Sequence, residues 1–106
     1  MKIAVATTDG LTVNEHFGRA KKFSIYNATP KTFDLLMAKD VEPYAAGQKD
    51  HAFDKVRFQE VAKVLEGCEK VFITKIGDKP AAALKALGIE PVVYSGAIKD
   101  IDLCRE

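Results

Sequence analysis

Short apolar runs divide the chain into expected strands. Residues 2–7 begin the chain with a buried run, residues 23–26 alternate apolar and polar positions, and residues 32–41 carry a further apolar stretch. Two more runs, 71–73 and 91–94, are short, apolar and rich in β-branched or aromatic residues. The pattern therefore predicts five strands.

The second half of the chain has helical spacing between its strands. A first helix is expected from His51 to Gly67, because apolar residues recur there at i, i+3, i+4 and i+7. The residues of this buried stripe are Phe58, Val61, Ala62 and Leu65. A second helix is expected over 78–87, where Pro80 suits the first turn and Gly88 the end.

The order of these elements predicts the fold class. The second and third strands are separated by a break at 29–31 and should form an antiparallel hairpin. The later strands are joined through helices, which favours parallel pairing by right-handed crossovers. Ile98, Ile101 and Leu103 indicate a short terminal helix. We expect an α/β fold with a mixed five-stranded sheet flanked by helices.

Composition and charge indicate a single folded domain and argue against a protein that binds nucleic acid or a membrane surface. The 106 residues are 47% hydrophobic and 29% charged, which is typical of one folded domain, here 1–106. The formal net charge of +1 predicts no attraction to nucleic acid or to an anionic membrane. The opening apolar run is too short for a signal peptide, so we expect a cytoplasmic protein. The two cysteines, Cys68 and Cys104, form no CxxC pair.

The segment 13–22 holds the most unusual chemistry. It places His16 in a polar loop that contains a glycine and lies just ahead of Arg19, Lys21 and Lys22. A neutral imidazole is a good iron ligand, and the neighbouring cations would offset the charge of an anionic cluster. The alternative is that His16 caps the loop or packs beside Phe17, since a single histidine has little specificity.

The local motif resembles that of a known family. The run Asn14-Glu15-His16-Phe17-Gly18, followed by Arg19, is similar to the signature of the dinitrogenase iron-molybdenum cofactor biosynthesis family, which includes NifX, NafY and the C-terminal part of NifB proteins. Residues 1–8 and 67–84 also resemble that family, so the likeness covers nearly the whole chain. It implies a ribonuclease-H-like fold and a role in nitrogen fixation.

The resemblance also implies a cargo and a set of site residues. The cargo would be iron-molybdenum cofactor or its iron-sulfur precursor, bound without a covalent link and passed from a donor to an acceptor among the nitrogenase cofactor-assembly proteins. His16 is the main candidate ligand. The residues expected to bind the cofactor are Asn14, Glu15, His16, Phe17, Gly18, Arg19 and Gly77, and the candidate metal ligands are His16, His51 and Cys68.

The donor atoms favour a carrier over a builder of clusters. A conventional iron-sulfur cluster takes about four thiolates, and two cysteines cannot supply them. A preformed cluster needs only one or two protein ligands. The turn at Gly77 lies at the start of an expected helix, where backbone N–H groups could bind an anionic group of the cargo.

Other functions are weaker alternatives. A nuclease of the ribonuclease-H type would need several carboxylates for two metal ions. Asp9 follows the first expected strand, but no acidic residue interrupts 71–73 or 92–94 to complete such a set. No phosphate-binding loop, dinucleotide fingerprint or nucleophile elbow occurs. We therefore expect no catalytic residues. A stand-alone interaction or regulatory domain of the same fold, without cluster cargo, stays open as the second hypothesis.

Overall fold

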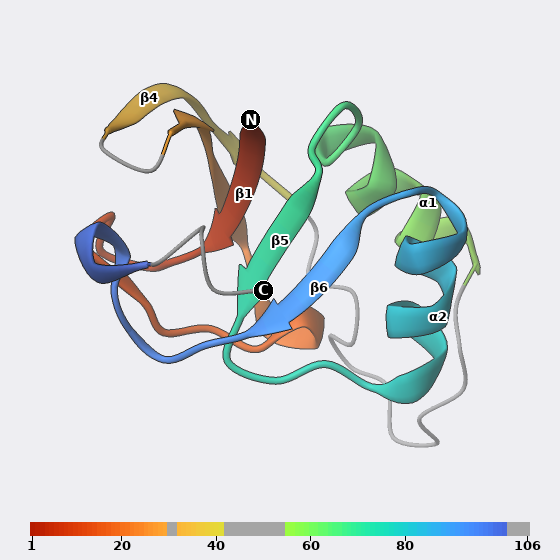
Figure 1. Ribbon diagram of the computed structural model, residues 1–106. Helices are drawn as coiled ribbons and strands as arrows, with labels where there is room; N and C mark the ends of the chain where they lie inside the picture. The colour runs from red at the N-terminus through yellow and green to blue at the C-terminus, as the bar shows by residue number, and fades with distance from the viewer. Residues whose placement is uncertain (30–31, 42–54, 102–106) are drawn as a thin grey trace.

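The computed structural model describes residues 1–29, 32–41 and 55–101 (Figure 1). The expected metal ligand His51 lies outside these residues, as do Leu103 and Cys104. In the described residues, neither α1 (Lys55–Val64) nor α2 (Asp78–Ala86) has the length and apolar character needed to cross a membrane.

A five-stranded sheet forms the centre of the described part of the chain, with the strand order β4-β3-β1-β5-β6. Its strands are β1 (Lys2–Ala6), β3 (Lys22–Ala28), β4 (Phe33–Asp40), β5 (Lys70–Ile73) and β6 (Glu90–Val93). β3 pairs antiparallel with both β1 and β4, whereas β1, β5 and β6 are parallel. The predicted mixed sheet is confirmed, with strand bounds within three residues of those expected.

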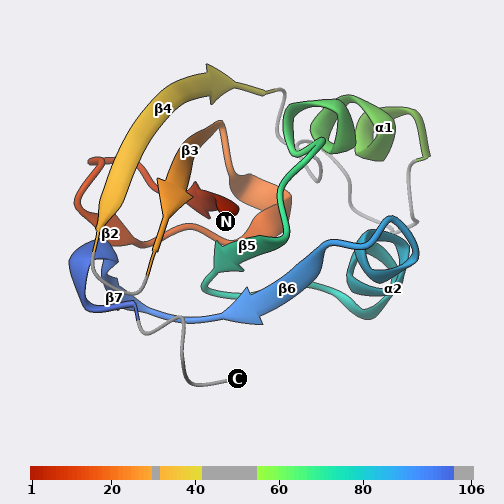
Figure 2. The same cartoon turned by 45° about the horizontal axis from the view of Figure 1, so that its top comes forward.

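Strand β1 is apolar and buried from Ile3 to Ala6 because the two faces of the sheet are covered there. Ala4 and Ala6 point to the face that carries α1 and α2, where they meet Phe23, Val71 and Leu84 in one core cluster. Figure 2 shows the two helices side by side on this face. The helical stripe read from the sequence is thereby confirmed, since Phe58, Val61 and Leu65 are buried and Ala62 packs against the same cluster.

The opposite face is covered without an α-helix in the described residues. Ile3 and Val5 of β1 pack there against a second cluster that includes Ile98 and Ile101. On this face, β2 (Thr12–Val13) pairs antiparallel with β7 (Gly96–Ala97). A single 3-10 turn, η2 (Ile98–Asp100), follows β7.

The expected terminal helix is therefore only this 3-10 turn within the described residues. Two apolar residues three apart, Ile98 and Ile101, are buried equally well by one tight turn, so their spacing alone did not specify an α-helix. The small β2/β7 sheet was not predicted, because two-residue strands are too short to show a period. The ribonuclease-H-like assignment stays a prediction.

Candidate functional site

The candidate site lies where β1 and β5 end. These neighbouring strands are parallel, so the loop after β1 (7–16) and the loop after β5 (74–77) leave the same edge of the sheet. The chain then turns toward β3 after β1 and toward α2 after β5, on opposite sides of the pair. Sheets of this kind commonly bind ligands at such a point.

Three hydrogen bonds join the two loops around His16. The backbone N–H of Thr74 donates to the carbonyl of Glu15 at 3.0 Å, and that of Phe17 donates to the carbonyl of Lys75 at 2.8 Å. Between them, Nδ1 of His16 lies 2.6 Å from Oγ1 of Thr74. These contacts fix both the backbone and the ring of His16.

The Thr74 contact occupies Nδ1 of His16 and leaves Nε2 as the ring nitrogen that could bind a metal. When Nδ1–H donates to the hydroxyl of Thr74, Nε2 keeps its lone pair and can coordinate a metal ion. The imidazole is exposed, so a ligand from solvent can reach it. The arrangement matches the hydrogen-bonded histidines that serve as metal ligands in proteins.

Asn14 shapes the loop through its own amide group. Oδ1 of Asn14 accepts from the backbone N–H of Thr8 at 2.9 Å, and its Nδ2 donates to Oγ1 of Thr8 at 2.8 Å. The backbone N–H of Asn14 also donates to the carbonyl of Ala6, the last residue of β1. Asn14 thus ties the segment that carries His16 back to the end of the central strand.

Asp9 holds the turn that precedes this segment. One carboxylate oxygen accepts from the backbone N–H groups of Leu11 at 2.8 Å and Thr12 at 2.9 Å. Hydroxyl groups of Thr7 and Thr12 also donate to the carboxylate. The backbone bonds from Leu11 and Thr12 lower the pKa of Asp9 to about 2. The carboxylate is used to build the turn.

Phe17 anchors the loop in the core. It begins the 3-10 turn η1 (Phe17–Arg19), and its ring is 1% exposed. The ring centroid lies 6.2 Å from those of Phe23 and Phe58. A residue this deeply buried supports the loop that carries His16 through its packing in the core. Gly18 is half-buried and Arg19 exposed in the same turn.

A polar hollow of about 220 Å³ lies beside the loop. It is lined by Thr7, Thr8, Glu15, Lys21, Lys22 and Asp40. The two lysines that the sequence predicted near His16 do gather here, together with Glu15. Their charge is matched by the carboxylates of Glu15 and Asp40, so this group of four charged side chains has no formal excess of positive charge.

Gly77 lies at the start of α2, two residues beyond the Lys75 carbonyl that binds Phe17. Gly77 is the residue before the first helical turn, and no side chain hydrogen bond caps that turn in the described structure. The first backbone N–H groups of α2 therefore point out of the helix end, as expected for Gly77 from the sequence.

Cys68 lies at the other end of β5, away from His16. It precedes the strand, whereas Thr74 follows it, and the four residues of β5 span roughly 10 Å between their first and last Cα atoms. Cys68 is buried, and that burial raises the pKa of its thiol. The structure does not bring Cys68 and His16 together.

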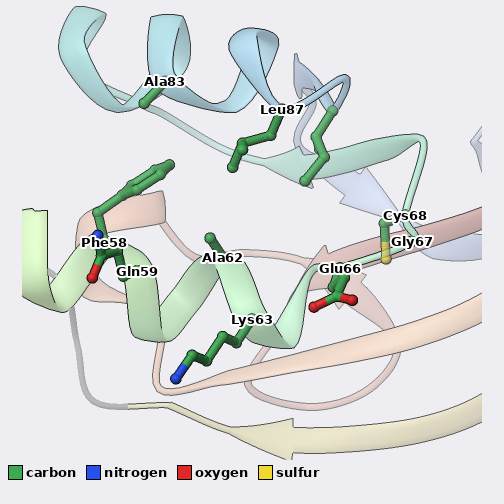
Figure 3. A pocket seen from close by; sticks show the side chains of 10 residues that line it. Phe58, Gln59, Ala62, Lys63, Glu66, Gly67, Cys68, Ala83 and Leu87 are labelled. Carbon is green, nitrogen blue, oxygen red and sulfur yellow. The ribbon is translucent and has the colours of Figure 1, made fainter.

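The pocket beside Cys68 is apolar (Figure 3). It has a volume of about 750 Å³ and opens between α1 and α2. Phe58 and Ala62 of α1 face Ala83 of α2 and Leu87, the residue that follows α2, across it. It lacks His16, and in the described part of the chain no three histidine, cysteine or acidic side chains gather into a metal site.

The sequence reasoning missed Thr74 and Lys75. Thr74 orients the imidazole of His16, and the exposed Lys75 brings a cation to the same loop pair. A signal was available, since polar residues directly after a buried strand lie at the edge where parallel sheets bind ligands. Pairing Thr74 with His16 also required knowing that β1 and β5 are neighbours.

The family model described as dinitrogenase iron-molybdenum cofactor matches residues 1–102. The chain belongs to this family. The family match covers His16, Thr74 and Gly77, and so spans both loops of the candidate site.

Two curated relatives and one solved structure illustrate the similarity. The FeMo cofactor biosynthesis protein NifB of Frankia alni is 40% identical over 90 residues, which are 85% of this chain and 18% of that protein. Protein NifX of Azotobacter vinelandii is 28% identical over 103 residues, covering 97% of this chain and 62% of NifX. The chain thus spans under a fifth of the NifB relative. The crystal structure of PH0822 shares the fold, with a TM-score of 0.69 and 21% identity over 95% of this chain and 84% of that one.

Proposed function

We propose that the protein binds iron-molybdenum cofactor, or its iron-sulfur precursor, as cargo and passes it between nitrogenase cofactor-assembly proteins in the cytoplasm. The observation that supports this most is the exposed imidazole of His16, whose Nδ1 lies 2.6 Å from Oγ1 of Thr74. In the tautomer with the proton on Nδ1, Nε2 keeps its lone pair for a metal. Family membership supports it, because the matching family model is described as dinitrogenase iron-molybdenum cofactor and the NifB relative is named a FeMo cofactor biosynthesis protein.

A single imidazole suits a carrier. A cluster assembled elsewhere already satisfies most of its iron with sulfide, so it needs few bonds from the protein, and few bonds allow release to the next protein. A binding site for a permanent cluster would instead enclose it with several thiolates. Cys68 is not part of the proposed site because it is buried beyond the far end of β5.

Charge around the imidazole favours an anionic cargo. Arg19 in η1 and Lys75 after β5 are exposed on the two loops that meet at His16, and the open start of α2 follows at Gly77. These groups can attract a negatively charged cluster or its organic acid. Lys21 and Lys22 contribute less, since Glu15 and Asp40 balance them in the polar hollow. We propose no catalytic step on the cargo.

Anaerobic cofactor capture tests this function. The purified chain is mixed with isolated iron-molybdenum cofactor and passed through a gel-filtration column, and iron and molybdenum are measured in the protein peak. We expect co-elution with the wild-type chain and weaker retention with His16→Ala. Lys99→Ala is the matched control, because Lys99 is an exposed cation in η2, outside the two site loops.

Two results would count against the proposal. If no metal co-elutes with the wild-type chain, the carrier function is wrong and the interaction or regulatory domain becomes the better hypothesis. If metal co-elutes equally with the wild-type chain and with His16→Ala, the chain is a carrier but His16 is not its ligand.

A further inference from the structure

Strand β4 exposes an apolar centre at the edge of the sheet in the described structure. Its eight residues pair on one side with β3, and the strand order places no described strand on its other side. Leu35 is 60% exposed, Leu36 50% and Met37 40%. A long edge strand with exposed apolar side chains is a ready template for pairing with another strand.

The pairing with β3 shows which backbone groups of β4 point outward. The N–H of Thr29 donates to the carbonyl of Thr32, and the N–H of Val41 donates to that of Lys21, so residues 32 and 41 bond toward β3. Backbone direction alternates along an antiparallel ladder. Counting forward from residue 32, Phe33 and Leu35 therefore present their backbone N–H and C=O groups to the free edge. Counting back from residue 41, Asp40 and Ala38 do the same.

A β-bulge makes this edge symmetric. Tyr26 faces Leu35 and Ile25 faces Met37, so Leu36 is the extra residue. The extra residue shifts the alternation of side chains and backbone groups by one position. The side chains of Leu35 and Ala38 therefore lie on the same face of the sheet, and the backbone groups of both residues point to the free edge. Without the bulge, residues 35 and 38 would point to opposite faces, and a twofold axis could not pair them.

We propose that β4 is the interface of a homodimer, in which two copies pair β4 antiparallel about a twofold axis at the bulge, with Leu35 facing Ala38 of the second copy. The outward backbone groups of Leu35 and Ala38 then bond to each other across the axis. Leu36 and Met37 lie at the centre, where their exposed side chains meet those of the second copy.

Charge complementarity supports this occupant and this register. The same pairing places Asp34 opposite Lys39 of the second copy, and by symmetry Lys39 opposite Asp34 of that copy. Within one chain the ladder places Asp34 beside Asn27 and Lys39 beside Phe23, so β3 offers neither charge its opposite. A second copy of this strand supplies apolar contact at the centre and two ion pairs at the flanks.

Sedimentation of the full chain over a range of concentrations tests the dimer, and charge reversal tests its register. Asp34→Lys places two lysines opposite each other at both flanks, and Lys39→Asp places two aspartates there. Each variant alone should dimerise about tenfold more weakly, since two favourable cross-strand pairs become repulsive. The double variant Asp34→Lys/Lys39→Asp should recover wild-type dimerisation, because it restores both pairs with the signs exchanged.

Mixing the two single variants gives a second readout that a folding defect cannot produce. A copy with lysine at both positions and a copy with aspartate at both positions should form a heterodimer at least as tight as the wild-type dimer. Ala38→Pro, which removes an outward N–H and leaves the bonds to β3 intact, should abolish the dimer without unfolding the chain. A wild-type chain that stays monomeric at all concentrations, or a dimer insensitive to the single reversals, would overturn the proposal.

Discussion

Nδ1 of His16 and Oγ1 of Thr74 lie 2.6 Å apart although 58 residues separate them in the chain. His16 follows the central strand β1 and Thr74 follows β5, its parallel neighbour, so the hydrogen bond joins the two loops that leave the same edge of the sheet. The contact orients an exposed imidazole that the sequence singles out as a candidate iron ligand. It also identifies Thr74 as the residue that engages Nδ1, which leaves Nε2 as the ring nitrogen without this contact.

Replacing the hydroxyl of Thr74 should weaken cofactor capture. Thr74→Val keeps the shape of the side chain but leaves Nδ1 of His16 without its partner, so the ring rotates and exchanges its proton between nitrogens. Loss of such an outer hydrogen bond typically costs about 10-fold to 100-fold in metal affinity. Titration of the chain with isolated cofactor measures it. Thr74→Ser keeps the hydroxyl and should bind nearly as the wild type does; equal binding by Thr74→Val would remove Thr74 from this role.

Truncating Phe17 should destabilise the whole domain. The ring packs between Phe23 and Phe58 with 1% of its surface exposed, so Phe17→Ala opens a large cavity. Comparable losses cost about 3–5 kcal/mol of unfolding free energy. Urea unfolding followed by circular dichroism measures the change. Phe17→Leu, which fills most of the space, should lose clearly less, and a loss as small for alanine as for leucine would show that the ring is not a core anchor.

The turn held by Asp9 should become weaker in acid. The pKa of Asp9 in the folded chain is about 2, below the ordinary 3.8, so its carboxylate stabilises the fold above pH 4 and that contribution is lost as the pH falls toward 2. Asp9→Asn removes the charge. The variant should be less stable than the wild type at neutral pH, and the difference should shrink between pH 4 and 2. Thermal unfolding of both chains over this range checks it; a difference independent of pH would contradict the lowered pKa.

Replacing Cys68 should leave cofactor capture unchanged. The thiol is buried near the apolar pocket between the helices, and β5 separates it from the loop of His16. Because burial raises the pKa of its thiol, Cys68 in a Cys104→Ser background should also react slowly with iodoacetamide at neutral pH and rapidly after unfolding. Cys68→Ala tested in the gel-filtration assay should retain as much iron and molybdenum as the wild type. Lost retention in a folded variant would return Cys68 to the set of ligands.

Much of the fold could be predicted because its strands and helices have clear periods. The apolar run of β1 and the stripe from Phe58 to Leu65 each indicate what they pack against. The elements that were missed are those with too few residues to show a period. The β2/β7 pair has two residues in each strand, and the 3-10 turn at Ile98–Asp100 shares its i, i+3 spacing with an α-helix.

The candidate site was only partly predictable for a different reason. His16 is marked by its local sequence, but its partner Thr74 becomes visible only when β1 and β5 are known to be neighbours. Phe17 shares the same local motif and yet is buried, because its ring packs against Phe23 of β3 and Phe58 of α1, which only the fold brings together. Cys68 is a candidate ligand by residue type alone, and its separation from His16 follows from the length and direction of β5.

Nitrogen hyperfine coupling from histidine to the bound cluster is the most direct test of the account. The chain contains two histidines, so it is labelled with ¹⁵N-histidine, loaded anaerobically with paramagnetic iron-molybdenum cofactor and examined by pulsed electron paramagnetic resonance. We predict a ¹⁵N coupling in the wild type and in His51→Gln that is absent from His16→Gln. A coupling that survives in His16→Gln, or that disappears only in His51→Gln, would contradict the assignment of His16 as the iron ligand.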